Sequence, residues 1–289
     1  MPSYMMIFCE AIMIRVRDIC FSYDRGEGPI LKGINLDILE GTYVGIIGPN
    51  GCGKTSLLRH LDGLLIPDEG AVLVDGMNTR DPHALKKIRQ LVGLVFQNPD
   101  NQIVGTTVEE DVSFGPGNLM LPSTEIKRRV EKALGIVGML QHARRQPHTL
   151  SSGEKQLVAI AGVLAMNPRY IACDEPTASL DPSARERILG VMRKLHREGI
   201  TVIHVTHHID EIVHADEVLV MERGTIIGRG KPGEILPRIE WLKGLGLDTP
   251  TVTELLWRLK RMGADVSAEA LTLQDACEQL YSMMGQKAP

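Results

Sequence analysis

The sequence predicts an α/β fold with an antiparallel β region at its N-terminus, a helical subdomain inserted in the α/β body and a small helical C-terminal extension. Three observations predict it. Apolar runs at 44–47, 170–173 and 201–205 are typical of buried strands, and helical patterns separate them. Two segments of alternating apolar and polar residues precede the first run, where a Rossmann-like chain would begin with βαβ units. Strand patterns then disappear between about residue 100 and residue 149.

Composition places the chain among ordinary globular proteins and excludes several other classes. It has 289 residues, 43% hydrophobic and 24% charged, enough for one large domain or two modest ones. The net charge is −4, from 32 basic and 36 acidic residues, which gives no sign of general nucleic-acid binding. The five cysteines are scattered and lack metal-ligand spacing, so we expect reduced cytosolic thiols without a disulfide framework: Cys9, Cys20, Cys52, Cys173 and Cys277.

The first 14 residues are rich in Met and Ile but do not have the pattern of a signal peptide. They lack a basic start and a small-residue cleavage site, and Glu10 interrupts the apolar run. Elsewhere no apolar run reaches the roughly 18 to 20 residues needed to span a bilayer. A regular strand pattern begins near Met13, so translation can start at Met1 or at Met13, and the status of residues 1–12 as an N-terminal extension stays open.

The N-terminal half begins with strands. Segments 14–21 and 30–38 alternate apolar and polar residues, as in half-buried strands, and a polar turn joins them. The buried strand 44–47 leads through a glycine-rich turn into a helical pattern at 56–61. A further strand at 71–74 ends at Asp75-Gly76, a pair typical of tight turns.

The middle of the chain is mainly helical. We expect a short helix at 84–90, a buried strand at 92–96 and another short helix at 107–112. Ser123 is expected to cap a longer helix. Its apolar residues share one face: Ile126, Val130, Ala133, Leu134 and Val137.

The last third returns to alternating strands and helices. Between strands 170–173 and 201–205 we expect a helix with Asp181 at its N-cap and Pro182 in its first turn. Two short strands, 217–221 and 225–229, follow. Beyond Pro232 the chain is mostly helical, and six apolar residues are expected to form one small satellite core: Trp241, Leu242, Leu245, Leu255, Leu256 and Leu259.

The turn after strand 44–47 matches the phosphate-loop pattern of a glycine, four residues, then glycine, lysine and a hydroxyl residue. Its backbone N–H groups and the following helix N-terminus can face one anion. Lys54 can reach the β- and γ-phosphates, and the Thr55 hydroxyl can bind Mg²⁺. The complete motif outweighs the alternative of a glycine-rich turn with a surface lysine, so we predict a phosphate-loop NTPase core. Its nucleotide-binding residues are Gly48, Pro49, Asn50, Gly51, Cys52, Gly53, Lys54, Thr55 and Ser56.

Strand 170–173 ends in two carboxylates, Asp174 and Glu175. A strand buried on both faces delivers its last residues to the carboxyl edge of the sheet, beside the phosphate loop. Asp174 is therefore a candidate magnesium ligand, and Glu175 a candidate base that activates water for attack on a γ-phosphate. The alternative is an acidic strand end before a turn, which the upstream glycine loop makes less favourable.

Segment 150–154 is a loop that enters a helix, and the Ser151 hydroxyl with the helix N–H groups can form a second anion site. Taken alone, this segment is better explained as an ordinary helix cap. At this point, however, the sequence resembles the ATP-binding cassette (ABC) ATPases, whose signature motif is Leu-Ser-Gly-Gly-Gln. Ser152 and Glu154 replace the usual glycine and glutamine, and Leu157 stands where the family often has arginine. These departures affect the expected ATP affinity and hydrolysis rate, but not the class.

The resemblance covers nearly the whole chain and implies an ATP hydrolase that binds ATP and Mg²⁺. It implies that Tyr23 stacks on adenine and that Gln97 contacts the magnesium ion and the attacking water. It also implies that His207 contacts the γ-phosphate, although a lone histidine after an apolar strand can be purely structural. His208 stands where the family commonly has aspartate. The loop 179–181 matches the segment that crosses the dimer interface.

Two such subunits are expected to pair head to tail. The second subunit would be another copy of this chain or a related ATPase. ATP would lie between Lys54 of one subunit and the signature segment of the other, formed by Ser151, Ser152, Gly153 and Glu154. On this resemblance the ABC ATPase domain spans 13–235, with a helical subdomain at about 100–165, and the C-terminal helical extension spans 236–289.

Three further segments resemble the energy-coupling-factor and cobalt/nickel importer ATPases: 96–102, 107–116 and 246–250. That resemblance implies a peripheral protein at the cytoplasmic face of the cell membrane. Its partners would be a transmembrane coupling protein and a substrate-binding membrane protein that import a small solute, a metal ion or a vitamin. No nucleic-acid partner is expected.

Other members of the wider class are possible alternatives. A DNA-repair ATPase would need a long coiled-coil insertion between Lys54 and Asp174, where only about 120 residues lie. A ribosome-associated cassette protein would normally carry two such domains. A scaffold without turnover would be expected to lose Lys54 or Glu175, and both are present. An ABC-type ATPase that acts on nucleic acid or the ribosome is the alternative to the importer.

Overall fold

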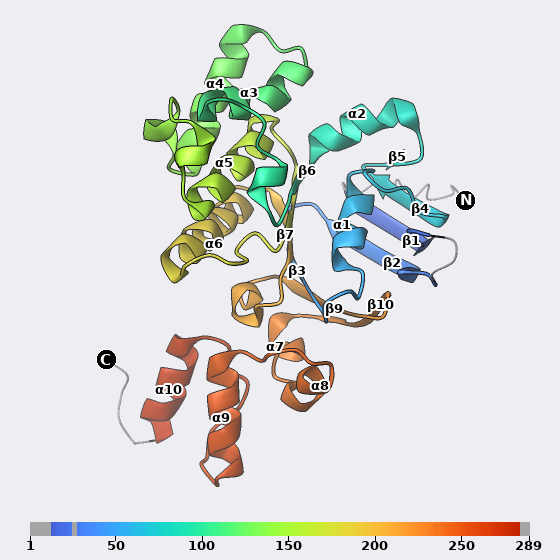
Figure 1. The fold of residues 1–289 in the computed structure, drawn as a ribbon. Helices are drawn as coiled ribbons and strands as arrows, with labels where there is room; N and C mark the ends of the chain where they lie inside the picture. The colour runs from blue at the N-terminus through green and yellow to red at the C-terminus, as the bar shows by residue number, and fades with distance from the viewer. Residues whose placement is uncertain (1–12, 25–27, 284–289) are drawn as a thin grey trace, which may run out of the picture.

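The computed structural model describes residues 13–24 and 28–283. Residues 1–12, including the first of the two candidate start sites, lie outside that part of the chain. Ten strands in the described part form two sheets, and helices cover and connect them (Figure 1). This arrangement confirms the predicted α/β fold with an antiparallel β region before the phosphate-loop core.

The N-terminal sheet is antiparallel, with strand order β2-β1-β4-β5. Its strands are β1 (Met13–Phe21), β2 (Leu31–Leu39), β4 (Glu69–Val74) and β5 (Met77–Asn78). Asp75 and Gly76 connect β4 to β5, and both have positive φ, as a tight hairpin turn requires.

The second sheet has strand order β10-β9-β3-β8-β7-β6. Five of its strands are parallel: β3 (Tyr43–Ile47), β6 (Val92–Val95), β7 (Tyr170–Asp174), β8 (Thr201–Val205) and β9 (Glu217–Glu222). Only β10 (Thr225–Gly230) runs antiparallel, beside β9. Because parallel strands point the same way, the segments that follow β3, β8, β7 and β6 emerge side by side at one edge of the sheet.

Helices lie around these sheets. They are α1 (Lys54–Leu61), α2 (Pro82–Leu91), α3 (Val108–Asn118), α4 (Ser123–Ile136), α5 (Ser152–Ala165), α6 (Pro182–Arg197), α7 (Pro232–Ile235), α8 (Ile239–Gly244), α9 (Thr251–Arg261) and α10 (Leu273–Met283). In Figure 1 the helices α3, α4 and α5 form one lobe, while α9 and α10 lie at the opposite end of the molecule. Short 3₁₀ turns link several elements: Pro99–Asn101, Leu140–His142, Pro147–Thr149 and Ile209–Ile212.

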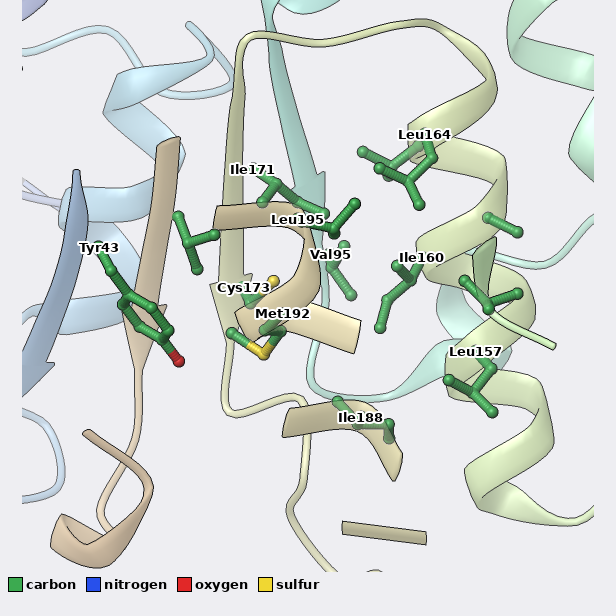
Figure 2. Close-up of a cluster of buried hydrophobic side chains, with 14 of the residues drawn as sticks. Tyr43, Val95, Leu157, Ile160, Leu164, Ile171, Cys173, Ile188, Met192 and Leu195 are labelled. Carbon is green, nitrogen blue, oxygen red and sulfur yellow. The ribbon is translucent and has the colours of Figure 1, made fainter. Parts of the chain in front are cut away.

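The parallel sheet separates two hydrophobic cores. Ile171 and Cys173 of β7 face the helical side, whereas Tyr170 and Ala172 of the same strand face the N-terminal sheet and α1. Figure 2 shows the first of these cores, in which side chains of the central strands meet those of α5 and α6. The described cysteines are free thiols, and burial raises the pKa of Cys173 to about 12, so this thiol stays protonated in the core.

Two sequence expectations about the helices were wrong. Ser123 is not a cap, because it is the first residue of α4, and Pro122 occupies the cap position without a side-chain hydrogen bond. The helix expected at 107–112 extends to Asn118, because Val108, Val112 and Pro116 are buried in its packing against neighbouring helices. A capping box between Thr107 and Glu110 starts that helix.

The expected single satellite core is divided between two places. Leu242 packs in the main helical-side core with Trp241 and Leu245 beside it. Leu256 belongs instead to a small separate cluster with Leu259, Val266, Ala270 and Ala276, and Leu255 is exposed. Helical periodicity identifies the apolar faces but not the surface each face packs against.

Candidate functional site

The phosphate loop has the geometry of an anion-binding turn. Strand β3 is fully buried and leads directly into it. Gly51 and Gly53 have φ of 75° and 106°, in the left-handed region that favours glycine. A Cβ on Gly48 would lie 2.3 Å from the carbonyl oxygen of Met221, so only glycine fits there. Gly53 caps α1 without a side-chain hydrogen bond, which keeps the first N–H groups of α1 available to an anion.

Lys54 lies across this loop. Its Nζ donates hydrogen bonds to the carbonyl oxygens of Gly48, at 2.7 Å, and Pro49, at 3.0 Å. The loop borders a cavity of about 280 Å³. The cavity is lined by Tyr23, Ile30, Asn50, Gly51, Gly53, Lys54, Thr55, Ser56 and Glu175. The lysine charge therefore lies beside a space bordered by backbone N–H groups, as a polyphosphate requires.

Thr55 and Asp174 form the candidate magnesium site. The Thr55 hydroxyl donates to Asp174 Oδ1 at 3.0 Å, although 119 residues separate them in the sequence. Burial raises the pKa of Asp174, and the hydrogen bond from Thr55 only partly offsets that effect. A cation would favour the ionised form of this buried carboxylate. No group of three or more His, Cys, Asp or Glu suited to a metal occurs in the described part of the chain. A hydroxyl and a carboxylate are oxygen ligands of the kind that Mg²⁺ takes beside phosphates, so Thr55 and Asp174 could hold this ion.

Glu175 lies between Gln97 and His207. Its Oε2 accepts a hydrogen bond from Gln97 Nε2 at 3.3 Å and lies 3.2 Å from His207 Nδ1. These residues follow β7, β6 and β8, three neighbouring strands, which explains why distant segments meet here. Glu175 has φ of 45°, an uncommon value for a residue with a side chain. We name the residues that line the cavity, with Asp174, Gln97 and His207, the phosphate-loop half-site.

Tyr23 is one of the residues that line the cavity. Its side chain is 49% exposed, and its hydroxyl lies 3.1 Å from Ser56 Oγ, within hydrogen-bond distance. The ring of Phe21 packs against it edge to face, at 5.0 Å between centroids. The exposed ring face is suited to stacking on a planar base.

The signature segment does not line this cavity. Ser151, Ser152, Gly153 and Glu154, which we name the signature half-site, begin helix α5 instead. Ser151 and Glu154 form a reciprocal capping box, with Glu154 Oε2 accepting from the Ser151 N–H at 2.8 Å. That hydrogen bond lowers the pKa of Glu154. Ser152 is exposed, whereas a Cβ on Gly153 would lie 2.6 Å from Ala184 Cβ.

Sequence reasoning missed Glu211, a buried carboxylate behind the phosphate-loop half-site. It lies in the 3₁₀ turn Ile209–Ile212 and is 7% exposed. Its two oxygens accept hydrogen bonds from the hydroxyls of Thr177 and Thr206, both at 2.7 Å. The only sequence signal was an acidic residue beside apolar Ile212, which is too weak to identify a site. By contrast, the Nε2 atom of His208 lies 3.1 Å from the guanidinium of Arg185, within hydrogen-bond distance.

Comparison with known proteins identifies the family. The family model described as ABC transporter matches residues 31–178, and that span includes the loop, the signature segment and both carboxylates.

The chain belongs to the ABC transporter family.

Curated relatives extend this match over the length of the chain. The cobalt import ATP-binding protein CbiO of Syntrophus aciditrophicus is 50% identical over 93% of this chain and 96% of its own length. The energy-coupling factor transporter ATP-binding protein EcfA1 of Caldanaerobacter subterraneus is 49% identical over 93% of this chain and 98% of its own. The predicted resemblance to these importer ATPases is thereby confirmed.

Solved structures agree with this ABC assignment. CbiO1 of Clostridium perfringens, described as part of the ABC transporter complex CbiONQ, matches with a TM-score of 0.74 and 37% identity over 88% of this chain and 98% of its own. The ATP-binding cassette MJ0796, in a dimeric post-hydrolysis state with ADP and phosphate, matches with a TM-score of 0.69 and 33% identity. The match covers 76% of this chain and 99% of the MJ0796 chain. The prediction of an ATP-binding, ATP-hydrolysing cassette is consistent with both.

Proposed function

We propose that this chain is the ATP-binding subunit of an ABC importer and couples ATP hydrolysis to the uptake of a small solute through separate membrane subunits. The observation that carries this proposal is the convergence of four strand ends at one sheet edge, where Lys54, the Thr55–Asp174 pair and Glu175 meet. The relatives named for cobalt import and energy coupling favour import. Within the chain, we assign 13–235 to the ATPase domain and 236–289 to the C-terminal extension.

The residues that contact the phosphates hold the substrate in place. The loop N–H groups and Lys54 bind the β- and γ-phosphates, and Tyr23 stacks on the adenine ring. Thr55 and Asp174, with Gln97, would hold Mg²⁺, which supplies neutralisation of the phosphate charge. The distance of 3.0 Å between the Thr55 hydroxyl and Asp174 supports this role.

Glu175 acts as the base. It accepts the proton of the attacking water as the water oxygen bonds to the γ-phosphorus and the bond to the oxygen of ADP breaks. Gln97 and His207 both contact the carboxylate of Glu175, so they can orient the water and the γ-phosphate beside it. ADP and phosphate are the products.

The second half of each ATP site comes from another subunit. The signature half-site does not line the cavity beside Lys54, yet Ser151 places a hydroxyl at the exposed N-terminus of α5. Head-to-tail pairing, with an identical or related chain, would bring that terminus to the γ-phosphate. Hydrolysis would then remove the γ-phosphate, which both subunits contact, and the subunits would separate more easily.

A groove between α3, α5 and β6 supports the proposed membrane partner. It has a volume of about 270 Å³, and Phe96, Gln102, Val104 and Phe114 are among the residues that line it. Val104 is 65% exposed and Phe114 is 58% exposed. Segments 96–102 and 107–116, both of which resemble importer ATPases, border this groove. We propose that a transmembrane coupling protein places a helix there and holds the ATPase at the cytoplasmic face of the membrane, beside a substrate-binding membrane protein.

Within the described ranges, 13–24 and 28–283, the protein has no helix long and apolar enough to cross a bilayer. Membrane association would therefore depend on the partner subunits. We propose a metal ion or a vitamin as the cargo class, since the relatives are named for cobalt import and energy coupling. The names of these relatives give no support to the alternative function on nucleic acid or ribosomes.

Co-expression with the membrane subunits tests this function. We expect the protein to fractionate with membranes and its ATPase rate to rise with the partners, but not with DNA or ribosomes. Phe114→Asp should reduce membrane recovery and leave partner-free ATPase activity unchanged. Met120→Asp is the matched control, because Met120 is 85% exposed and lies outside the groove. Recovery only in the cytosolic fraction would contradict the importer assignment.

A further inference from the structure

Glu211 connects the two segments that carry the proposed catalytic residues. Its Oε1 accepts from the Thr177 hydroxyl, two residues after Glu175. Its Oε2 accepts from the Thr206 hydroxyl, which directly precedes His207. The same carboxylate thus bonds to the segment that carries Glu175 and to the segment that carries His207. The Glu175 Oε2 and His207 Nδ1 atoms are 3.2 Å apart.

The surroundings of Glu211 favour a fixed, ionised carboxylate. Thr177 and Thr206 are each 1% exposed, so water does not compete for their hydroxyls. His204 Nε2 lies 3.4 Å from Oε2, and Arg185 Nε lies 3.5 Å from Oε1. Burial raises the pKa of Glu211, but His204 and the two hydroxyls outweigh it and leave the value at about 2. Charge-assisted hydrogen bonds of this kind fix geometry more strongly than neutral ones.

Glu175 needs such support. Its backbone has φ of 45°, which an L residue adopts only when its neighbours hold it there. On one side, the Glu175 N–H donates to the carbonyl oxygen of Val205 at 2.9 Å. On the other side, the chain is fixed two residues later, at Thr177. Loss of the hydrogen bond from Thr177 to Glu211 would leave the carboxylate of Glu175 free to move relative to His207.

We propose that Glu211 is a positioning residue for ATP hydrolysis: through Thr177 and Thr206 it holds Glu175 and His207 at their productive separation. It does not line the cavity beside the phosphate loop, so it acts through these residues and not on ATP. This inference rests on the proposed ATP hydrolysis.

Steady-state kinetics of Glu211→Gln test the proposal. Gln keeps the shape but cannot accept from both hydroxyls with the strength of a carboxylate. We expect kcat to fall by about 10- to 100-fold, the scale of a displacement of about 1 Å at a catalytic group. The KM for ATP should change by less than about twofold, because the loop and Tyr23 are untouched. Glu198→Gln is the control: Glu198 is exposed at the end of α6, and its carboxylate has no partner in the described residues. Its kcat should equal that of wild type.

A double-mutant cycle separates positioning from folding. Thr177→Val with Thr206→Val removes both hydroxyls at nearly constant volume, and with them the bond that Thr206 accepts from the His208 N–H at 3.0 Å. This pair should therefore lower kcat at least as much as Glu211→Gln does. Addition of Glu211→Gln to that pair should lower kcat little further, because the interaction is already lost. ATP-binding stoichiometry should stay at the wild-type value in all variants.

Four outcomes would overturn the proposal. The first two are a wild-type kcat in Glu211→Gln and a wild-type kcat in the threonine pair with full ATP binding. The third is a combined variant in which the fold-loss of kcat equals the product of the losses in Glu211→Gln and in the threonine pair. The fourth is a kcat that falls only in proportion to ATP-binding stoichiometry. A wild-type protein without ATP hydrolysis would overturn the proposed function itself, and the positioning role with it. The two failures are therefore distinguishable.

Discussion

The two half-sites are built in different ways. In the phosphate-loop half-site, Thr55 reaches Asp174 across 119 residues, and Gln97 reaches Glu175 across 78. In the signature half-site, Ser151 and Glu154 bond to each other three residues apart. The first depends on the order of strands in the sheet, and the second depends on one helix cap. This difference indicates that substitutions in the first should disturb chemistry, whereas those in the second should disturb pairing between subunits.

The largest effect is expected from Glu175→Gln. General-base help contributes about 10² to 10⁴ in rate, so turnover should fall by roughly that range. The change also removes a negative charge near the γ-phosphate, where like charges about 4 Å apart repel by roughly 4 kcal/mol at an effective dielectric of 20, before solvent screening. ATP-bound dimers should therefore become tighter. A phosphate-release assay, with size-exclusion chromatography in ATP and Mg²⁺, measures both effects. Wild-type turnover would exclude Glu175 as the base.

Lys54→Ala should weaken nucleotide binding and turnover together. Hydrogen bonds to charged groups contribute about 1.5 to 3 kcal/mol, so the Kd for ATP should rise roughly 10- to 150-fold. Titration with a fluorescent ATP analogue measures this change. Lys32→Ala, at an exposed position of β2, is the control. An unchanged Kd in Lys54→Ala would show that the loop does not bind ATP through this side chain.

Ser151→Ala should weaken ATP-dependent pairing and leave ATP binding by the isolated subunit unchanged. The change removes the hydroxyl that would face the partner's ATP, and the loss of an N-cap costs about 1 kcal/mol. Asp81→Ala removes the side-chain cap of α2, away from either half-site, and so isolates the effect of capping alone. Analytical ultracentrifugation of both variants in the Glu175→Gln background measures pairing. Equal dimer fractions in the two variants would contradict a specific role for Ser151.

Glu154→Gln should have the smallest effect, because glutamine also forms a capping box. The pKa of Glu154 is lowered in the folded protein, from an ordinary value of 4.5, so its ionised form contributes stability above that pH. As pH falls through the folded pKa, this contribution is lost. Near pH 7 the free energy of unfolding of wild type should thus exceed that of the variant by less than about 1 kcal/mol. Its melting temperature should be correspondingly slightly higher. The difference should vanish in acid. A constant difference down to acid pH would contradict this assignment.

Much of the fold could be predicted because its signals are local. Buried strands give apolar runs, and the Asp181-Pro182 cap marks the start of α6. The errors arose where packing decides. Pro122 displaced Ser123 from the cap position, and Leu242 joined the main core while Leu256 formed another. Helical periodicity contains no information about which surface a face will bury.

The sequence by itself determined which motifs the candidate site contains: a glycine loop with Lys54 and Thr55, a strand ending in Asp174 and Glu175, and a capped helix at Ser151. Each is a short motif whose residues act as neighbours in the chain. The tertiary structure alone decided that Glu175 contacts His207 and Gln97. It also decided that Glu211 accepts hydrogen bonds from Thr177 and Thr206, in the segments that carry Glu175 and His207. These contacts depend on strand order in the parallel sheet and on burial, and both are set by packing between segments far apart in the chain.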